Sequence, residues 1–133
     1  MQALENIVSS IQAPWLVLFL LGLGFLILKK LGRVSPKVAN EMLTAGAVVI
    51  DVRGRAEYSA GHLPGSVNVP LGEIASTIHE VSPNKARPIL VYCLSGSRSA
   101  MAKRVLAGHG YMQVANLGSL SRARVLLGAG KVG

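Results

Sequence analysis

The stretch PILVYCLSGSRSAMA, residues 88–102, connects a run of strand-forming residues to a helical pattern through a short loop. The loop is rich in glycine and serine, and it begins at Cys93, which is the only cysteine of the chain. In open α/β sheets the reactive groups lie beyond the C-terminal ends of the strands, where loops lead into helices. The stretch therefore predicts an α/β fold, and within it a reactive position for Cys93.

Strand and helix patterns alternate on both sides of this stretch. The sequence AVVIDV, residues 47–52, is a compact β-branched run without alternation, which is typical of a strand covered on both faces in a parallel sheet. Further elements are expected as short strands at residues 67–69 and 111–117, and as helices at residues 36–45, 73–81, 99–110 and 119–128. This alternation predicts an α/β domain with a mainly parallel sheet flanked by helices.

The N-terminal part of the chain carries its longest apolar run. No charged residue occurs within residues 6–28, which is long enough for a membrane span of about 20 residues. Only Glu5 and the terminal amine precede the run. Three basic residues follow it closely, namely Lys29, Lys30 and Arg33. By the positive-inside rule, the part of the chain that follows the run lies in the cytoplasm.

Two other interpretations of the apolar run remain open. A cleaved signal peptide has basic residues before the run and a small-x-small cleavage site after it, and this chain shows neither pattern. A buried core helix needs a domain large enough to surround it, which about 100 residues hardly provide. We expect residues 1–32 to be a transmembrane anchor with a basic flank, inserted through residues 7–28, and residues 33–133 to be the folded domain.

Composition excludes several classes of function. The chain has 133 residues and a net charge of +8, but its basic residues are scattered and only 5% of its residues are aromatic. A nucleic-acid interface is therefore not expected, because it needs clustered basic residues or a stacking platform. One cysteine forms no internal disulfide, and with three scattered histidines it makes no structural zinc site. We expect neither a metal nor a cofactor.

The loop after the strand suits an anionic sulfur. Cys93 precedes the positive end of the expected helix, where several backbone N–H groups have no partner. Gly96 allows the loop to turn with a positive φ, and the small Ser95 and Ser97 let the backbone approach the sulfur. Helix termini and arginine lower the pKa of a thiol, so we expect a thiolate nucleophile, with Arg98 holding an anionic substrate. The alternative is an inert buried cysteine.

Two long motifs in the right order identify a family resemblance. DVRGRAEYSAGHLPGSVNVP, residues 51–70, followed by VYCLSGSRSAMA, residues 91–102, closely resembles the single-domain rhodaneses, which are sulfurtransferases. The likeness covers about residues 34–117. It implies a rhodanese-like domain in which Cys93 takes the outer sulfur of thiosulfate or another persulfide and passes it to a thiol or to cyanide. Such ping-pong transfer proceeds through a covalent persulfide.

The resemblance also implies roles for the residues around Cys93. The persulfide and the substrate would be held by the loop that follows it, which comprises Leu94, Ser95, Gly96, Ser97, Arg98 and Ser99. Asp51, Arg53 and Glu57 are expected to form an ion-pair network beneath this loop, in a supporting role. His62, in the sequence GHLPG, is expected to be structural rather than a general base.

The chain also differs from related proteins in two places. Phosphatases of the same fold count seven residues from cysteine to arginine, whereas Cys93 to Arg98 counts six, which favours sulfur over phosphate chemistry. The last part, NLGSLSRARVLLGAG at residues 116–130, lacks the double glycine and the tryptophan that the family usually shows. A membrane-bound, non-catalytic binding module with this fold is therefore the alternative function.

The expected location also follows from the resemblance. An anchor followed by one such domain resembles single-pass proteins of the bacterial inner membrane, here with the rhodanese-like domain in the cytoplasm. Gly22 and Gly24 are too closely spaced for a small-xxx-small helix contact, so the sequence predicts no particular oligomeric state.

Overall fold

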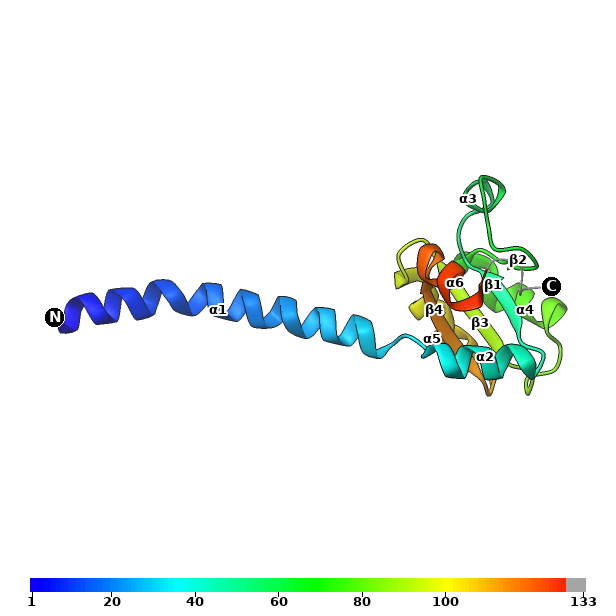
Figure 1. The fold of residues 1–133 in the computed structure, drawn as a ribbon, viewed down its shortest axis with the longest axis horizontal. Coiled ribbons are helices and arrows are strands. Elements are labelled where there is room, and N and C mark those ends of the chain that lie inside the picture. Colours follow the sequence, from blue (N-terminus) through cyan, green and yellow to red (C-terminus); the bar gives the residue numbers. More distant parts are fainter. Residues whose placement is uncertain (129–133) are drawn as a thin grey trace. The chain divides into compact units, whose positions relative to one another are not determined.

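A computed structural model describes residues 1–128, and for residues 11–13 and 29–31 it describes the backbone only. The chain divides into two compact units, Met1–Gly32 and Arg33–Gly133. The first unit is a single helix, α1, at Gln2–Leu31 (Figure 1). Within the described residues α1 is the one helix long and apolar enough to cross a membrane, judged by length and composition. None of its most apolar window is buried, so the interpretation as a core helix is wrong.

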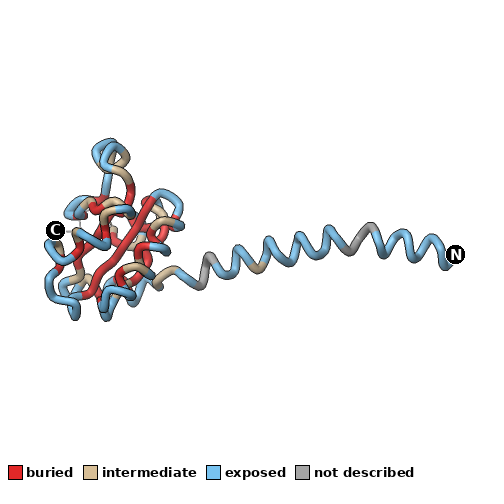
Figure 2. The backbone as a smooth tube through the Cα atoms, turned by 180° about the vertical axis from the view of Figure 1, so that it is seen from behind, coloured by how far each residue is buried: buried red, intermediate tan, exposed pale blue. Residues whose placement is uncertain are grey.

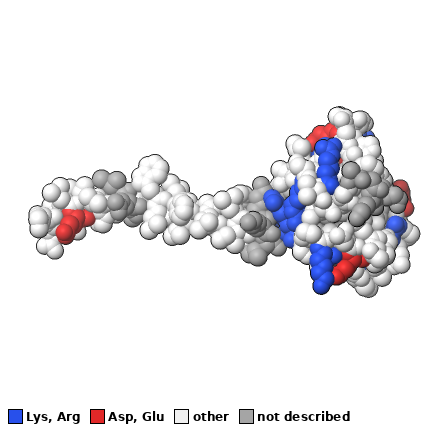
Figure 3. Space-filling view, viewed as in Figure 1, with Lys and Arg blue, Asp and Glu red and all other residues white. Residues whose placement is uncertain are grey.

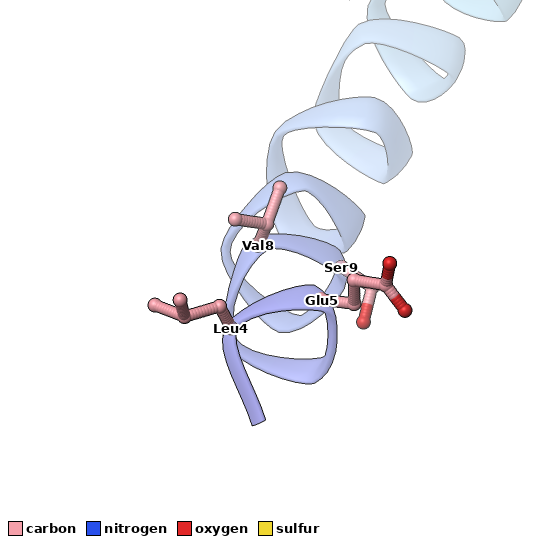
Figure 4. A pocket seen from close by; sticks show the side chains of 4 residues that line it. All are labelled: Leu4, Glu5, Val8 and Ser9. Atoms are coloured by element: carbon pink, nitrogen blue, oxygen red, sulfur yellow. The ribbon is translucent and has the colours of Figure 1, made fainter. Parts of the chain in front are cut away.

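The first turns of α1 separate polar from apolar side chains. Figure 4 shows Leu4 and Val8 on one side of the helix, and Glu5 and Ser9 on another. The four side chains line a shallow hollow on the surface of this lone helix.

The second unit is built on a four-stranded sheet in the order β2-β1-β3-β4, with all neighbouring strands parallel. The strands are β1 at Val48–Asp51, β2 at Val67–Asn68, β3 at Ile89–Cys93 and β4 at Val114–Ser119. All residues of β1 and β3 are buried, which explains why their sequences are unbroken apolar runs (Figure 2). The expected parallel α/β architecture is confirmed.

Helices cover both faces of the sheet. They are α2 at Pro36–Thr44, α3 at Arg55–Ser59, α4 at Ile74–Val81, α5 at Ser97–Gly108 and α6 at Leu120–Leu127, with a 3-10 turn, η1, at Leu71–Glu73. Apolar residues of α4 and α5 pack on one face of the sheet, and those of α2 and α6 pack on the other. The short α3 contributes no buried residue.

Local sequence signals explain where the helices begin. The Ser35 hydroxyl accepts a hydrogen bond from the Val38 N–H at 3.3 Å, and Pro36 follows at the first helical position of α2. Ser119 caps α6 in the same way, through the Arg122 N–H at 3.1 Å. α5 begins at Ser97, two residues earlier than expected, because Gly96 rather than a serine is its N-cap.

An irregularity between β3 and β4 determines what lies beside Cys93. Val91 pairs with Asn116, but Tyr92 pairs with Gly118, so Leu117 is an extra residue in β4. Such a bulge bends the strand locally, and Gly118 adopts a φ of 90° there. As a result β4 extends to Ser119, beyond the expected end at residue 117, and Ser119 lies opposite Cys93.

Candidate active site

Cys93 is the last residue of β3 and lies at the C-terminal edge of the sheet. It has no exposed surface, and its neighbours below are apolar residues of the core. Above, the Gly96 N–H donates a hydrogen bond to Cys93 Sγ at 3.0 Å, and the Ser99 hydroxyl lies 3.5 Å from the same sulfur. The sulfur is therefore buried, but its environment is partly polar because an N–H group and a hydroxyl group donate to it.

Gly96 is the turning point of the loop. Its φ is 97°, which an L side chain rarely adopts. A Cβ on this residue would also lie 3.2 Å from the Cα of Gly118, in the neighbouring strand. The position therefore requires glycine both for its backbone conformation and for the close approach of the loop to β4.

Asn116 holds the same turn from the side, and the sequence analysis missed it. Its side-chain amide donates to the Gly96 carbonyl at 3.3 Å, while its side-chain oxygen accepts the Gly118 N–H at 2.8 Å. Asn116 is 3% exposed. A polar side chain inside the apolar segment VANLG is the signal that would have found it, because a buried amide needs such partners.

The environment of Cys93 favours the thiolate. Burial raises the pKa of the thiol, but the Ser99 hydroxyl and the backbone N–H groups of Ser99, Gly96 and Ser95 lower it by more. The pKa of Cys93 therefore lies below its ordinary value, a shift that increases the thiolate fraction at a given pH.

Arg98 is held by Glu57 from another part of the chain. Its two terminal nitrogens donate to the two carboxylate oxygens of Glu57 at 2.7 and 2.9 Å. The bidentate pair, followed by the Gly54 N–H, lowers the pKa of Glu57 to about 2. Its folded-state pKa is below its ordinary value of 4.5, so the pair stabilises the fold above that pH and loses this contribution as the pH falls toward about 2.

Asp51 and Arg53 form a separate, buried pair. Arg53 Nη2 lies 2.7 Å from Asp51 Oδ2 and also donates to the Gly61 carbonyl at 2.7 Å. The Arg53 N–H donates to Asp51 Oδ1 at 2.9 Å, so the pair fixes the turn after β1. These four residues thus form two separate ion pairs, Asp51–Arg53 and Glu57–Arg98, and Glu57 makes no ion pair with Arg53.

The remaining loop residues present their side chains to solvent. Leu94 is 57% exposed, and the Ser95 and Ser97 hydroxyls lie 3.2 Å apart on the surface. Only backbone atoms of these residues remain to face the sulfur. His62 stacks on Tyr58, with the ring centroids 3.6 Å apart, and its Nδ1 lies 2.7 Å from the Tyr58 carbonyl oxygen.

The charges around Cys93 predict opposite effects of two substitutions. Arg98→Gln should raise the pH at which alkylation of Cys93 by iodoacetamide reaches half its maximal rate, because a positive charge near the thiolate is lost. Glu57→Gln should lower this midpoint, because it removes the carboxylate that neutralises Arg98. Burial of Cys93 slows its alkylation at every pH. The pH at which the rate is half-maximal is determined by the ionisation of the thiol.

Because the chain has a single cysteine, the alkylation rate reports on Cys93 alone. Arg104→Gln, an exposed change on the same helix as Arg98, is the matched control and should leave the midpoint unchanged. Shifts of the same sign for Arg98→Gln and Glu57→Gln would contradict this account of the electrostatics.

Comparisons with known proteins agree with this geometry. Residues 35–121 match the protein family described as the rhodanese-like domain. The thiosulfate sulfurtransferase PspE of Escherichia coli is 39% identical over 71 residues, which are 53% of this chain and 68% of the relative. The thiosulfate:glutathione sulfurtransferase of Saccharomyces cerevisiae is 36% identical over 75 residues. That match covers 48% of this chain and only 54% of the yeast protein.

Solved structures show the same fold. A structure described as rhodanese with anions from E. coli superimposes with a TM-score of 0.57 and 36% identity. The match covers 58% of this chain and 91% of the other. The part of the chain that matches is the domain with the Cys93 loop, because the family match begins at residue 35.

Proposed function

The chain belongs to the rhodanese-like domain family, and from this we propose that it is a sulfurtransferase that carries sulfur on Cys93. The observation that carries the proposal is the Gly96 N–H, which donates to the Cys93 sulfur at 3.0 Å inside a six-residue loop from Cys93 to Arg98. The names of the two relatives support thiosulfate as a donor. We extend the proposal to other persulfide donors and to thiol or cyanide acceptors.

The first half of the reaction charges the cysteine. The Cys93 thiolate attacks the outer sulfur of thiosulfate, and a sulfur–sulfur bond forms as the bond inside thiosulfate breaks. The bonding electron pair leaves with sulfite, and the product is a Cys93 persulfide anion. In the resting protein the Gly96 N–H stabilises negative charge on Cys93 Sγ, the attacking atom. We propose that the N–H groups of the same loop stabilise the charge on the outer sulfur of the persulfide, as preorganised N–H groups do for developing anions.

The second half discharges the persulfide. An acceptor thiolate attacks the outer sulfur, which moves to the acceptor, and the electron pair of the broken bond returns to Cys93. With cyanide as the acceptor the product is thiocyanate, and in both cases no external oxidant or reductant is needed. The lowered pKa of Cys93 assists this step, because a stable thiolate is a better leaving group.

Access to the sulfur requires movement of the loop. Cys93 is fully buried, whereas the Arg98 side chain is 36% exposed and is tied to Glu57. We propose that Arg98 loosens its pair with Glu57 to hold the oxygens of the incoming donor. Solvent weakens a partly exposed ion pair, so a dianionic donor competes with Glu57 for Arg98 at small cost.

Intact mass spectrometry tests the charged intermediate directly. After treatment with thiosulfate and removal of the excess, the protein should gain the mass of one sulfur atom. The gain should disappear when cyanide is added, with thiocyanate formed in equal amount. A protein that gains no sulfur from thiosulfate or from a persulfide donor would refute the proposed function.

We further propose that residues 1–32 anchor the rhodanese-like domain, residues 33–133, to the inner membrane of a bacterium. The support is the apolar span Gln2–Leu28 of α1, with a mean hydropathy of 2.2, and the basic residues that follow this span, Lys29, Lys30 and Arg33. A fluorescent protein fused after Gly133 should fluoresce in the membrane fraction, and alkaline phosphatase fused there should be inactive. A non-fluorescent fusion together with active alkaline phosphatase would place the C-terminus outside the cytoplasm. A soluble product without α1 would indicate a cleaved signal peptide.

A further inference from the structure

The carbonyl oxygen of Leu117, the extra residue of the β4 bulge, is bound by a side chain. Arg122 Nη1 donates to this oxygen at 2.6 Å. Leu117 is fully buried. A bulge leaves its extra residue outside the regular ladder, and a buried backbone carbonyl needs a hydrogen-bond donor. Arg122 therefore stabilises β4 at the point where its ladder with β3 is interrupted.

The same guanidinium also fastens the free edge of β4. Arg122 Nη2 donates to the Val34 carbonyl at 2.6 Å, and the Val34 N–H donates to the Asn116 carbonyl at 2.9 Å. Because β4 is an edge strand, Val34 takes the place of a further strand beside Asn116. Arg122 is thus connected to both Asn116 and Leu117, to the first through Val34 and to the second directly.

The bulge lies between the two β4 residues that contact the Gly96 turn. Asn116, before the bulge, donates to the Gly96 carbonyl at 3.3 Å. Gly118, after it, has its Cα 3.2 Å from the position that a Cβ on Gly96 would take. The Asn116 side-chain oxygen accepts the Gly118 N–H at 2.8 Å, so this side chain spans the bulge. A change in the shape of the bulge would therefore move both contacts of the Gly96 turn.

Arg122 is itself held in place at the same end of β4. Its N–H donates to the hydroxyl of Ser119, which is the strand partner of Cys93. Among residues 1–128 no carboxylate forms an ion pair with Arg122, so its side chain serves backbone carbonyls. Burial, followed by the charge of Arg33, lowers the pKa of Arg122. The planar fork of the guanidinium, more than its charge, suits it to hold two carbonyls at once.

We infer that Arg122 is a positioning residue for sulfur transfer, and that it acts through the Leu117 bulge and Asn116 on the Gly96 turn. The inference rests on the proposed function, because it concerns the loop that serves the sulfur on Cys93. Arg122 needs no contact with the substrate in this role. It fixes the bulge, the bulge fixes Asn116, and Asn116 keeps the turn in the conformation in which the Gly96 N–H points at Cys93 Sγ.

The experiment uses the full-length protein in detergent. Arg122→Met removes the donors but keeps a long side chain. The kcat for thiocyanate formation should fall about three- to tenfold, with KM for thiosulfate within about twofold of wild type, because orientation rather than binding is lost. The pH midpoint of Cys93 alkylation by iodoacetamide should rise, because the hydrogen bond to the thiolate weakens. Arg98, whose charge acts on Cys93, and its partner Glu57 are unchanged.

Arg122→Lys separates geometry from charge. Its ammonium keeps the positive charge but lacks the fork, so kcat and the alkylation midpoint should shift in the same directions as in Arg122→Met. Arg124→Met is the matched control, because it removes a positive charge from an exposed position of the same helix, and it should change neither quantity. Lys and Arg side chains lie at several places on the visible face of the second unit (Figure 3), so the loss of one exposed charge is a small change.

Three results would overturn the inference. They are wild-type kcat and midpoint in Arg122→Met, wild-type values in Arg122→Lys, and an equal shift in Arg124→Met. A merely structural role would lower the unfolding temperature Tm without moving the midpoint. If Arg122→Met does not fold, Arg122→Lys alone decides. The proposed function is judged separately, by the mass gain of the wild-type protein with thiosulfate, and the alkylation midpoint requires no sulfur transfer, so the two failures are distinguishable.

Discussion

Cys93→Ser should reduce the formation of thiocyanate from thiosulfate and cyanide by about 10³-fold or more, because it removes the nucleophile. A serine hydroxyl remains protonated at neutral pH and forms no persulfide, even though the Gly96 N–H and the Ser99 hydroxyl still surround it. The change is nearly isosteric, so the fold should persist. Turnover is measured as thiocyanate, and the bound sulfur is measured as the mass gain after treatment with thiosulfate.

The same variant separates the enzyme from a non-catalytic binding module. A module that holds a partner through its surface would keep its cellular role in Cys93→Ser, whereas a sulfurtransferase would lose it. As a control, the unfolding temperature Tm of Cys93→Ser should equal that of the wild-type protein, so that a loss of the cellular role reflects lost chemistry rather than lost stability. Thiocyanate formation above a few per cent of the wild-type rate would place the sulfur carrier elsewhere, which a chain with one cysteine does not readily allow.

The elements that the sequence predicted well are those with strong local signals. The runs at β1 and β3 are unbroken and β-branched because both faces are buried, so their identity as parallel strands followed directly. Ser35 and Pro36 marked the start of α2 for a similar reason, since capping chemistry is local. Cys93 and its loop were recognisable because strand, loop and helix are contiguous in the chain.

The elements that it missed depend on contacts between distant residues. Arg98 was expected to face only the substrate, and its partner Glu57 lies 41 positions away on a helix of five residues. No periodicity connects these two side chains. Asn116 was missed because its role depends on the bulge at Leu117, which becomes visible only when the register of β3 and β4 is known.

These distant contacts change the expected role of Arg98. In the structure its charge is paired with Glu57, and in the proposed mechanism this pair must loosen before Arg98 holds a donor. The groups that donate hydrogen bonds to Cys93 Sγ in the resting protein are the Gly96 N–H and the Ser99 hydroxyl. Loop conformation should therefore affect sulfur transfer more than the charge at position 98, and Gly96 is the residue that determines this conformation.

Gly96→Ala should lower the sulfur transfer rate about 10²-fold, the usual effect of losing one preorganised N–H donor. Alanine disfavours the φ of 97°, and its Cβ would lie 3.2 Å from the Gly118 backbone, so the turn must move away from β4. This movement should lengthen or bend the hydrogen bond from the Gly96 N–H to Cys93 Sγ. The variant should also lose about 2–3 kcal/mol of unfolding free energy, measured by urea denaturation, because backbone strain and steric overlap add.

Gly46→Ala is the matched control, because Gly46 has a similar φ of 87° but nothing within 4 Å of the position its Cβ would take. It should cost about 1 kcal/mol of stability through backbone strain alone and should leave the transfer rate unchanged. The difference between the two variants then isolates the contact of the loop with β4. If both lost the same stability and Gly96→Ala kept its activity, the N–H of Gly96 would not be the group that stabilises the sulfur anion, and the transfer mechanism would have to rely on Arg98 and Ser99 instead.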